Sequence, residues 1–218
     1  MRNILLILII LIPALVFPQT SRQQIKEMKE GVMLVRLKTS EKVIEGLKDA
    51  GLYDKAKEVR QEQKKENQEI AAAYHKSFDF CPVYFFYSDC SGKVREGDFK
   101  DCLMDHNLEK LKSVPEIGDN YFISEFSYVQ KTDPAYFDKN IMAYDTTGYK
   151  IKQKTYYGGT ELGPDAVIIM DRHFRQLRGP FPSYVRTYEG FPILRRKKPK
   201  AVAKLNEALQ EYYKKTVK

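Results

Sequence analysis

Residues 81–87 read CPVYFFY and form the most aromatic and apolar run of the chain outside its extreme N-terminus. Polar pairs, Ser88-Asp89 and Ser91-Gly92, close the run. A short segment this rich in Tyr, Phe and Val fits a strand buried on both faces better than a half-exposed one. The run therefore predicts the central strand of a single sheet, with helices before it and alternating strands and helices after it.

The residues before this run carry the spacing of amphipathic helices. Apolar side chains recur at three- and four-residue intervals at Ile25, Met28, Val32 and Val35. Gly51 is typical of a helix end, and a second helical pattern begins directly after it. Residues 20–78 are therefore predicted to form a helical hairpin, followed by an α/β sheet domain over 79–218.

The chain after residue 87 alternates between helical and extended patterns. The predicted elements are a helix beginning at Asp98, a strand over 121–129, a helix beginning at Asp133-Pro134 with Tyr144 on one face, an edge strand over 149–157, a buried strand over 166–170, a hairpin partner over 174–177, irregular chain over 179–192 and a final helix with Val202, Leu205, Leu209 and Tyr212 on its apolar face. This order predicts the α/β class with a mixed sheet, and α+β is the alternative.

Residues 1–19 have the layout of a secretory signal peptide. Arg2 provides the positive start, and the segment from Ile4 to Phe17 is apolar except for Pro13. This segment is shorter than the roughly 20 residues that a spanning helix needs. We therefore expect an exported protein of the periplasm or the extracellular space. The alternative is a protein held at the membrane by an uncleaved N-terminal segment.

The chain is basic, with a formal net charge of +8. For an exported protein this charge suits an anionic envelope ligand, such as lipid headgroups or acidic polysaccharide, although plain solubility explains it equally well. Residues 195–200, RRKKPK, would suggest a nucleic-acid patch in an intracellular protein. Behind a secretion signal they are interpreted as a solvated run before the last helix, so no nucleic-acid partner is expected.

The sequence contains three cysteines, Cys81, Cys90 and Cys102, which allow one disulfide and one free thiol. Cys81 begins the buried strand and is expected to behave as a small apolar residue. Cys90 and Cys102 flank a polar segment and are the candidate pair if a bridge forms. Cofactor fingerprints and histidine spacings typical of metal sites do not occur, so neither a cofactor nor a metal is expected.

From Cys81 onward the order is strand, helix, strand, helix, strand, strand, helix, with Pro164 just before the third core strand. This order, over residues 81–215, resembles the thioredoxin-like fold in topology. The resemblance implies that Cys90 stands near the place of the attacking thiol, whereas Lys93 occupies the place of a resolving cysteine. It further implies that strand 166–170 runs antiparallel beside strand 81–87. Pro164 would then come close to Cys90, in a groove completed by Asp98 and Asp165.

These observations lead to three hypotheses of function. The first is an exported, non-catalytic protein of the cell envelope that binds a protein or an anionic envelope ligand. The alternative is a single-thiol redox enzyme of thioredoxin-like type that uses Cys90 as its nucleophile. The third is binding of an acidic glycan or lipid by tyrosines that lie near basic residues, namely Tyr156, Tyr157, Tyr184 and Tyr188 with Arg186.

Overall fold

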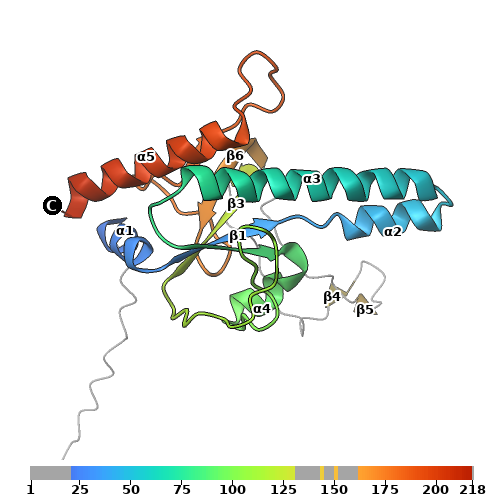
Figure 1. Cartoon of the computed structure of the whole chain (residues 1–218), viewed down its shortest axis with the longest axis horizontal. Coiled ribbons are helices and arrows are strands. Elements are labelled where there is room, and N and C mark those ends of the chain that lie inside the picture. The colour runs from blue at the N-terminus through green and yellow to red at the C-terminus, as the bar shows by residue number, and fades with distance from the viewer. Residues whose placement is uncertain (1–20, 131–142, 145–149, 152–161, 218) are drawn as a thin grey trace, which may run out of the picture.

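The computed structural model describes residues 21–130, 143–144, 150–151 and 162–217. The described chain confirms the α/β class, because helices pack against a five-stranded mixed sheet. In Figure 1, helices α3 and α5 lie side by side across one face of the sheet, and the short helix α4 lies on the other face. None of the described helices combines the length and apolarity required to cross a membrane.

The sheet has the strand order β2-β1-β3-β6-β7. Its strands are β1 (Val32–Leu37), β2 (Val83–Tyr87), β3 (Tyr121–Gln130), β6 (Leu162–Met170) and β7 (Tyr184–Arg186). Strand β1 is parallel to both β2 and β3, whereas β6 is antiparallel to β3 and to β7. The prediction that residues 81–87 form the central strand is wrong, because β2 lies at an edge. Among the residues that the structure describes, its outer side is paired through a bridge between Phe85 and Met104.

The prediction of continuous helix from residue 21 to residue 49 is also wrong. Helix α1 (Ser21–Glu30) ends before Gly31, and the chain then enters β1. A Cβ atom at Gly31 would lie 1.9 Å from the carbonyl oxygen of Asn120, so only glycine allows this close approach. Residues 33–35 are all fully buried, which suits an interior parallel strand and not a helix stripe. Residues 21–78 are therefore not a separate helical hairpin.

A helical hairpin does form from helices α2 (Glu41–Asp49) and α3 (Tyr53–Ser77), which pack against each other. Gly51 has φ +75°, the left-handed conformation expected of a residue after a helix end. The free end of this hairpin projects beyond the sheet (Figure 1). The part of α3 near its C-terminus instead covers the sheet and supplies buried Ile70, Ala73 and Tyr74.

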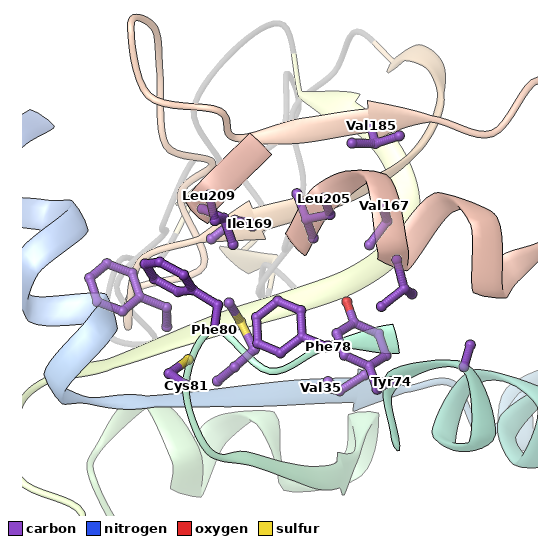
Figure 2. Close-up of a cluster of buried hydrophobic side chains, with 14 of the residues drawn as sticks. Val35, Tyr74, Phe78, Phe80, Cys81, Val167, Ile169, Val185, Leu205 and Leu209 are labelled. Carbon is purple, nitrogen blue, oxygen red and sulfur yellow. The ribbon is translucent and has the colours of Figure 1, made fainter. Parts of the chain in front are cut away.

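The main core lies between the sheet and helices α1, α3 and α5 (Lys198–Val217). Figure 2 shows Tyr74, Phe78 and Phe80 facing the side chains of α5 and β6. Val202, Leu205 and Leu209 of α5 are fully buried, which confirms the predicted apolar face of the last helix. A smaller core on the opposite face contains Phe86 and Leu103.

The segment after β2 contains a 3-10 turn (Ser88–Cys90) and helix α4 (Ser91–Arg95). The predicted helix from Asp98 is wrong: the Asp98 carboxylate accepts a hydrogen bond from the backbone N–H of Lys100, at 3.0 Å, and Asp101 has a positive φ. Both features are typical of a turn, whereas a helix would need regular backbone hydrogen bonds between residues four apart. A disulfide joins Cys90 to Cys102, with their Cα atoms 5.9 Å apart, so the candidate pair is the bridged pair.

The C-terminal half agrees with the sequence in most elements that are described. Strands β3 and β6 confirm the predictions over 121–129 and 166–170, and residues 174–177 return to β6 through a bridge at Gln176. Residues 179–192 are not all irregular, because β7 pairs with β6. Tyr144, predicted on a helix face, lies in strand β4 (Ala143–Tyr144), which pairs with β5 (Lys150–Ile151). Residues 131–142 and 152–161 lie outside the described chain.

Candidate functional site

The groove predicted between Cys90, Asp98 and Pro164-Asp165 is not assembled from neighbouring strands. Strands β1 and β3 lie between β2 and β6. Three strand spacings of about 4.8 Å separate β2 from β6 by about 14 Å. The expectation that strand 166–170 lies beside strand 81–87 is therefore wrong. The expectation failed because β1, which the sequence pattern predicted to be helical, is a strand of the sheet and lies between them. The wider thioredoxin-like resemblance stays a prediction.

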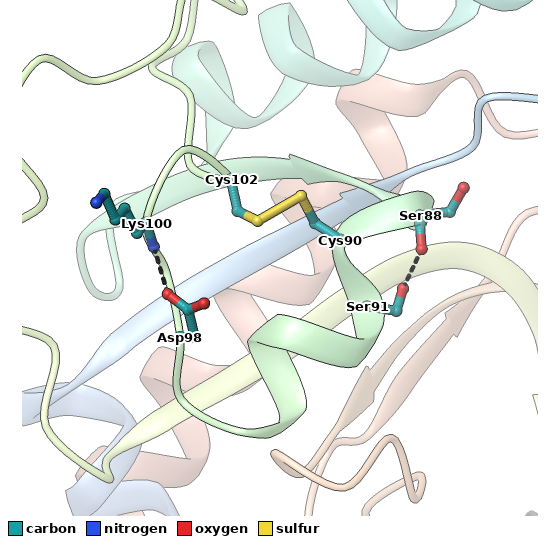
Figure 3. The surroundings of a disulfide bond; sticks show 6 residues. All are labelled: Ser88, Cys90, Ser91, Asp98, Lys100 and Cys102. Carbon is teal, nitrogen blue, oxygen red and sulfur yellow. Dashed lines mark hydrogen bonds between the residues drawn. A yellow bond between two sulfur atoms is a disulfide. The ribbon is translucent and has the colours of Figure 1, made fainter.

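Cys90 and Asp98 lie on the same face of the sheet, in the segment that the disulfide closes (Figure 3). Cys90 is half-buried, and its sulfur is bonded to that of Cys102. A single-thiol reaction requires a thiolate as the nucleophile. In this structure Cys90 does not provide one. Asp98 is exposed, and its carboxylate is used within its own turn.

A partly buried polar cluster lies where the carboxyl end of β1 passes the middle of β3. The guanidinium of Arg36 donates to both carboxylate oxygens of Glu125, at 2.9 and 3.0 Å, and its Nε donates to Ser91 Oγ, at 2.9 Å. The same guanidinium lies 5.9 Å from the ring centre of Phe174. Because the two opposite charges satisfy each other, we interpret this cluster as a link between the sheet and α4.

Asp165 lines a small cavity of about 120 Å³ together with Lys38 and Lys198. Pro164 is exposed beside it. A cavity of this size is below the range of about 300–1,000 Å³ that small-molecule sites occupy. Tyr156 and Tyr157 lie outside the described residues.

Two histidines that are distant in sequence lie together at the end of α3. The rings of His75 and His106 stack with their centres 4.1 Å apart, beside a cavity of about 310 Å³ that Cys81 also lines. Burial raises the pKa of the Cys81 thiol to about 12, so this cysteine is protonated at neutral pH. Within the described ranges, no group of three or more His, Cys, Asp or Glu side chains is arranged to hold a metal ion.

Tyr184 and Arg186 lie on β7 with exposed side chains and lead into residues 187–197, which we call the basic loop. Its two ends are tied together. The backbone N–H of Arg196 donates to the carbonyl of Thr187, at 2.7 Å. The guanidinium of Arg196 donates to the carbonyl of Arg186 and lies 5.5 Å from the ring centre of Tyr188. The basic loop is therefore a closed structure with a fixed base.

Hydrogen bonds inside the basic loop hold its course. The backbone N–H of Phe191 donates to the carbonyl oxygen of Tyr188, at 3.0 Å, and the backbone N–H of Leu194 donates to the carbonyl oxygen of Phe191, at 2.9 Å. The loop projects from the molecule at the top of Figure 1, coloured between orange and red. Three of its apolar side chains remain in solvent, with exposed fractions of 65% for Phe191, 98% for Ile193 and 62% for Leu194. We call these three side chains the apolar tip.

A cavity of about 600 Å³, which we call the basic groove, lies between the basic loop, α3 and the start of α5. Its lining residues are Glu69, Ala72, Ala73 and Lys76 of α3, and Glu189, Pro192, Arg195, Arg196, Lys197, Lys198 and Pro199. Alanine and proline side chains provide apolar walls. The lining has five basic and two acidic side chains, so its formal charge is 5 − 2 = +3.

Only part of this positive charge is compensated. Lys198 lies 3.5 Å from carboxylate oxygens of both Glu66 and Glu69, and Arg195 lies 2.7 Å from a carboxylate oxygen of Glu189. Within the part of the chain that the structure describes, the side-chain ammonium groups of Lys76 and Lys197 form no ion pair or hydrogen bond. The groove can therefore attract a negatively charged group without breaking an existing ion pair.

Comparison with protein-family models, with curated proteins and with solved structures finds no match to this chain. The basic groove is therefore interpreted from its own geometry. The interpretation of residues 195–200 as a solvated run is incomplete, because these residues line the basic groove together with part of the loop before them. Phe191-Pro192-Ile193-Leu194 stands directly before that run. Four apolar residues next to a basic run indicate a surface that is both apolar and positively charged.

Proposed function

We propose that this chain is an exported, non-catalytic binding protein of the cell envelope that binds an anionic, partly apolar ligand in the basic groove. The observation that carries the proposal is the combination of apolar walls with a lining charge of +3 in a cavity of about 600 Å³. Export is supported by the signal-like residues 1–19 and by the Cys90–Cys102 disulfide, since disulfides persist in oxidising compartments.

The groove favours an amphiphile over a simple anion. Ala72, Pro192 and Pro199 are exposed and provide surface that gains from contact with hydrocarbon. Lys76 and Lys197 provide cations that can reach an acidic group at the same time. A ligand with a sulfate, phosphate or carboxylate group on a short hydrocarbon chain satisfies both properties, whereas an uncharged analogue satisfies only one.

Calorimetric titration with octyl sulfate, and with octyl glucoside as the uncharged analogue, tests the proposal. We expect octyl sulfate to bind more tightly and its affinity to fall when salt is raised from about 20 mM to about 500 mM, because salt screens charges at the surface. Replacing both Lys76 and Lys197 with glutamine should weaken binding of octyl sulfate by about tenfold, at about 0.7 kcal/mol for each exposed charge pair.

The matched control replaces Lys57 and Lys214 with glutamine. Both lysines lie in exposed parts of α3 and α5, and neither lines the groove. At 1.5 Å per helical residue, Lys57 lies about 28 Å along α3 from Lys76. This control removes the same charge and should leave the affinity unchanged. Equal weakening by both double variants, or equal binding of the two amphiphiles, would contradict the proposal.

A further inference from the structure

We infer that the apolar tip of the basic loop inserts into the surface of an anionic lipid bilayer. The inference rests on the proposed function and makes it specific, because it identifies the anionic partner as membrane lipid. Phe191, Ile193 and Leu194 are each more than 60% exposed, although three large apolar side chains within four residues would ordinarily be buried. A bilayer interface supplies the apolar environment that the described part of the chain does not give them.

The basic loop cannot easily hide its tip against the protein. Its base is tied by Arg196 to Thr187 and Arg186, and its interior is held by two backbone hydrogen bonds. The ion pair between Arg195 and Glu189 closes the loop across its width. The exposed side chains are therefore presented by an ordered support, which lowers the entropic cost of insertion.

The distribution of charge favours an anionic membrane. Residues 172–218 contain 13 basic and 3 acidic residues, a net charge of +10, whereas the whole chain carries +8. Residues 1–171 therefore carry 8 − 10 = −2. The positive charge is concentrated in the segment that contains the basic loop and α5. Basic side chains beside a membrane-inserted apolar segment are attracted to anionic headgroups, and their long stems allow the charges to stay at the interface.

The tip also discriminates between the two classes of anionic envelope ligand. Sugars are recognised by flat aromatic faces combined with polar groups. Two of the three tip side chains, Ile193 and Leu194, are aliphatic and offer neither. Hydrocarbon contact is the interaction that such side chains make favourably. A lipid bilayer therefore accounts for both the tip and the basic residues, whereas an acidic polysaccharide accounts only for the basic residues.

The test uses tryptophan as a reporter, because the natural chain contains none. Ile193→Trp places the only indole at the tip, and Val43→Trp places it on α2, where Val43 is 56% exposed. The full chain is mixed with vesicles of phosphatidylglycerol and phosphatidylcholine in equal parts, or of phosphatidylcholine alone. A local reporter is needed because the apolar segment within residues 1–19 can itself attach the chain to any vesicle.

We expect the emission of Ile193→Trp to shift to shorter wavelength and to be quenched by brominated acyl chains with the anionic vesicles, and to change little with phosphatidylcholine alone. The emission of Val43→Trp should not change in either case. Replacing Phe191 and Leu194 with serine in the Ile193→Trp chain should raise the concentration of anionic vesicles needed for half-maximal quenching by at least about tenfold, since two apolar side chains are lost from the interface.

Two outcomes would overturn the inference, and they differ from failure of the proposed function. If octyl sulfate binds as expected but Ile193→Trp is not quenched, the groove binds anions and the tip does not insert. If replacing Phe191 and Leu194 with serine leaves the quenching of Ile193→Trp unchanged, insertion does not depend on the apolar tip. Failure of octyl sulfate binding together with quenching of Ile193→Trp would instead contradict only the proposed role of the groove.

Discussion

Replacing Tyr74 with phenylalanine removes one hydroxyl group from the main core. Tyr74 is fully buried, and its hydroxyl lies 2.5 Å from Ser124 Oγ. Ser124 Oγ is also 3.0 Å from the carbonyl oxygen of Ile168, to which it donates. The two hydrogen bonds together connect α3 to strands β3 and β6. Because Ser124 keeps its bond to Ile168 in the variant, we expect a loss of about 1–2 kcal/mol in the free energy of unfolding at neutral pH.

The loss should become smaller at alkaline pH. Burial raises the pKa of Tyr74 well above its ordinary value, and the hydrogen bond with Ser124 opposes this effect only in part. Above about pH 10 the unfolded chain therefore releases the proton while the native chain keeps it. The contribution of Tyr74 is present below that pH and is lost as the pH rises, by about 0.8 kcal/mol at pH 10.5. Phenylalanine has no such proton.

Urea unfolding of the natural chain and of Tyr74→Phe, followed by circular dichroism at pH 8 and pH 10.5, measures this difference. The gap between the two free energies of unfolding should narrow at the higher pH. The other tyrosines titrate in both proteins and cancel. The double variant with Ser124→Ala should show coupling of about 1 kcal/mol between the two sites. A gap that is constant with pH would refute the buried, neutral state of Tyr74.

Three further predictions concern the disulfide, the free cysteine and the last helix. Replacing Cys90 and Cys102 with alanine should lower the free energy of unfolding by about 3 kcal/mol, because the bridge closes a loop with a sequence separation of 12, and adding a reductant should lower only the stability of the natural chain. Cys81 is 7% exposed and its pKa is raised to about 12, so thiol titration at pH 8 should detect no fast thiol in the native protein, one after denaturation and three after reduction. A fast native thiol would contradict both assignments. Leu205→Ala should cost about 3 kcal/mol in urea unfolding, since Leu205 is fully buried, and a loss below about 1 kcal/mol would contradict the packing of α5 on the sheet.

Strands with continuous apolar runs could be predicted from the sequence, and one strand could not. Residues 121–129 and 166–170 are long enough and rich enough in branched and aromatic side chains to exclude a helix. The sequence did not predict strand β1, because Val32 and Val35 continue the helical spacing of Ile25 and Met28. The decisive feature is the approach of Gly31 to Asn120, a contact between residues that are distant in sequence. No local pattern contains that information.

The order of the strands could not be predicted either, because it also depends on contacts between residues that are distant in sequence. A run of buried residues shows that a strand is covered on both faces, but not which strands lie beside it. Residues 83–87 are covered at their outer edge by Met104, in a segment held by the disulfide at Cys102. The predicted groove depended on neighbouring strands and failed with them. The disulfide pair was predictable, because it joins two cysteines within one short polar segment.

The basic groove could be predicted only in part, because its walls come from segments more than 100 residues apart. Glu69, Ala72, Ala73 and Lys76 form one stripe on α3, and nothing in that stripe indicates a ligand until the basic loop lies against it. The loop itself carries a local signal in residues 191–198, where an apolar group of residues precedes four basic ones. The apolar and basic parts of this segment indicate a binding surface only when they are considered together.

The two halves of the loop also offset each other physically. An exposed apolar tip favours association between copies of a protein, and a concentrated positive charge opposes it, because like charges on two approaching copies repel. Near an anionic surface the same positive charge attracts the protein to that surface. The repulsion between copies in solution is then replaced by attraction to the place where the tip can be buried in hydrocarbon. In the inferred mode of binding, the net charge of +10 over residues 172–218 has two effects: it opposes association between copies in solution and favours attachment at the membrane.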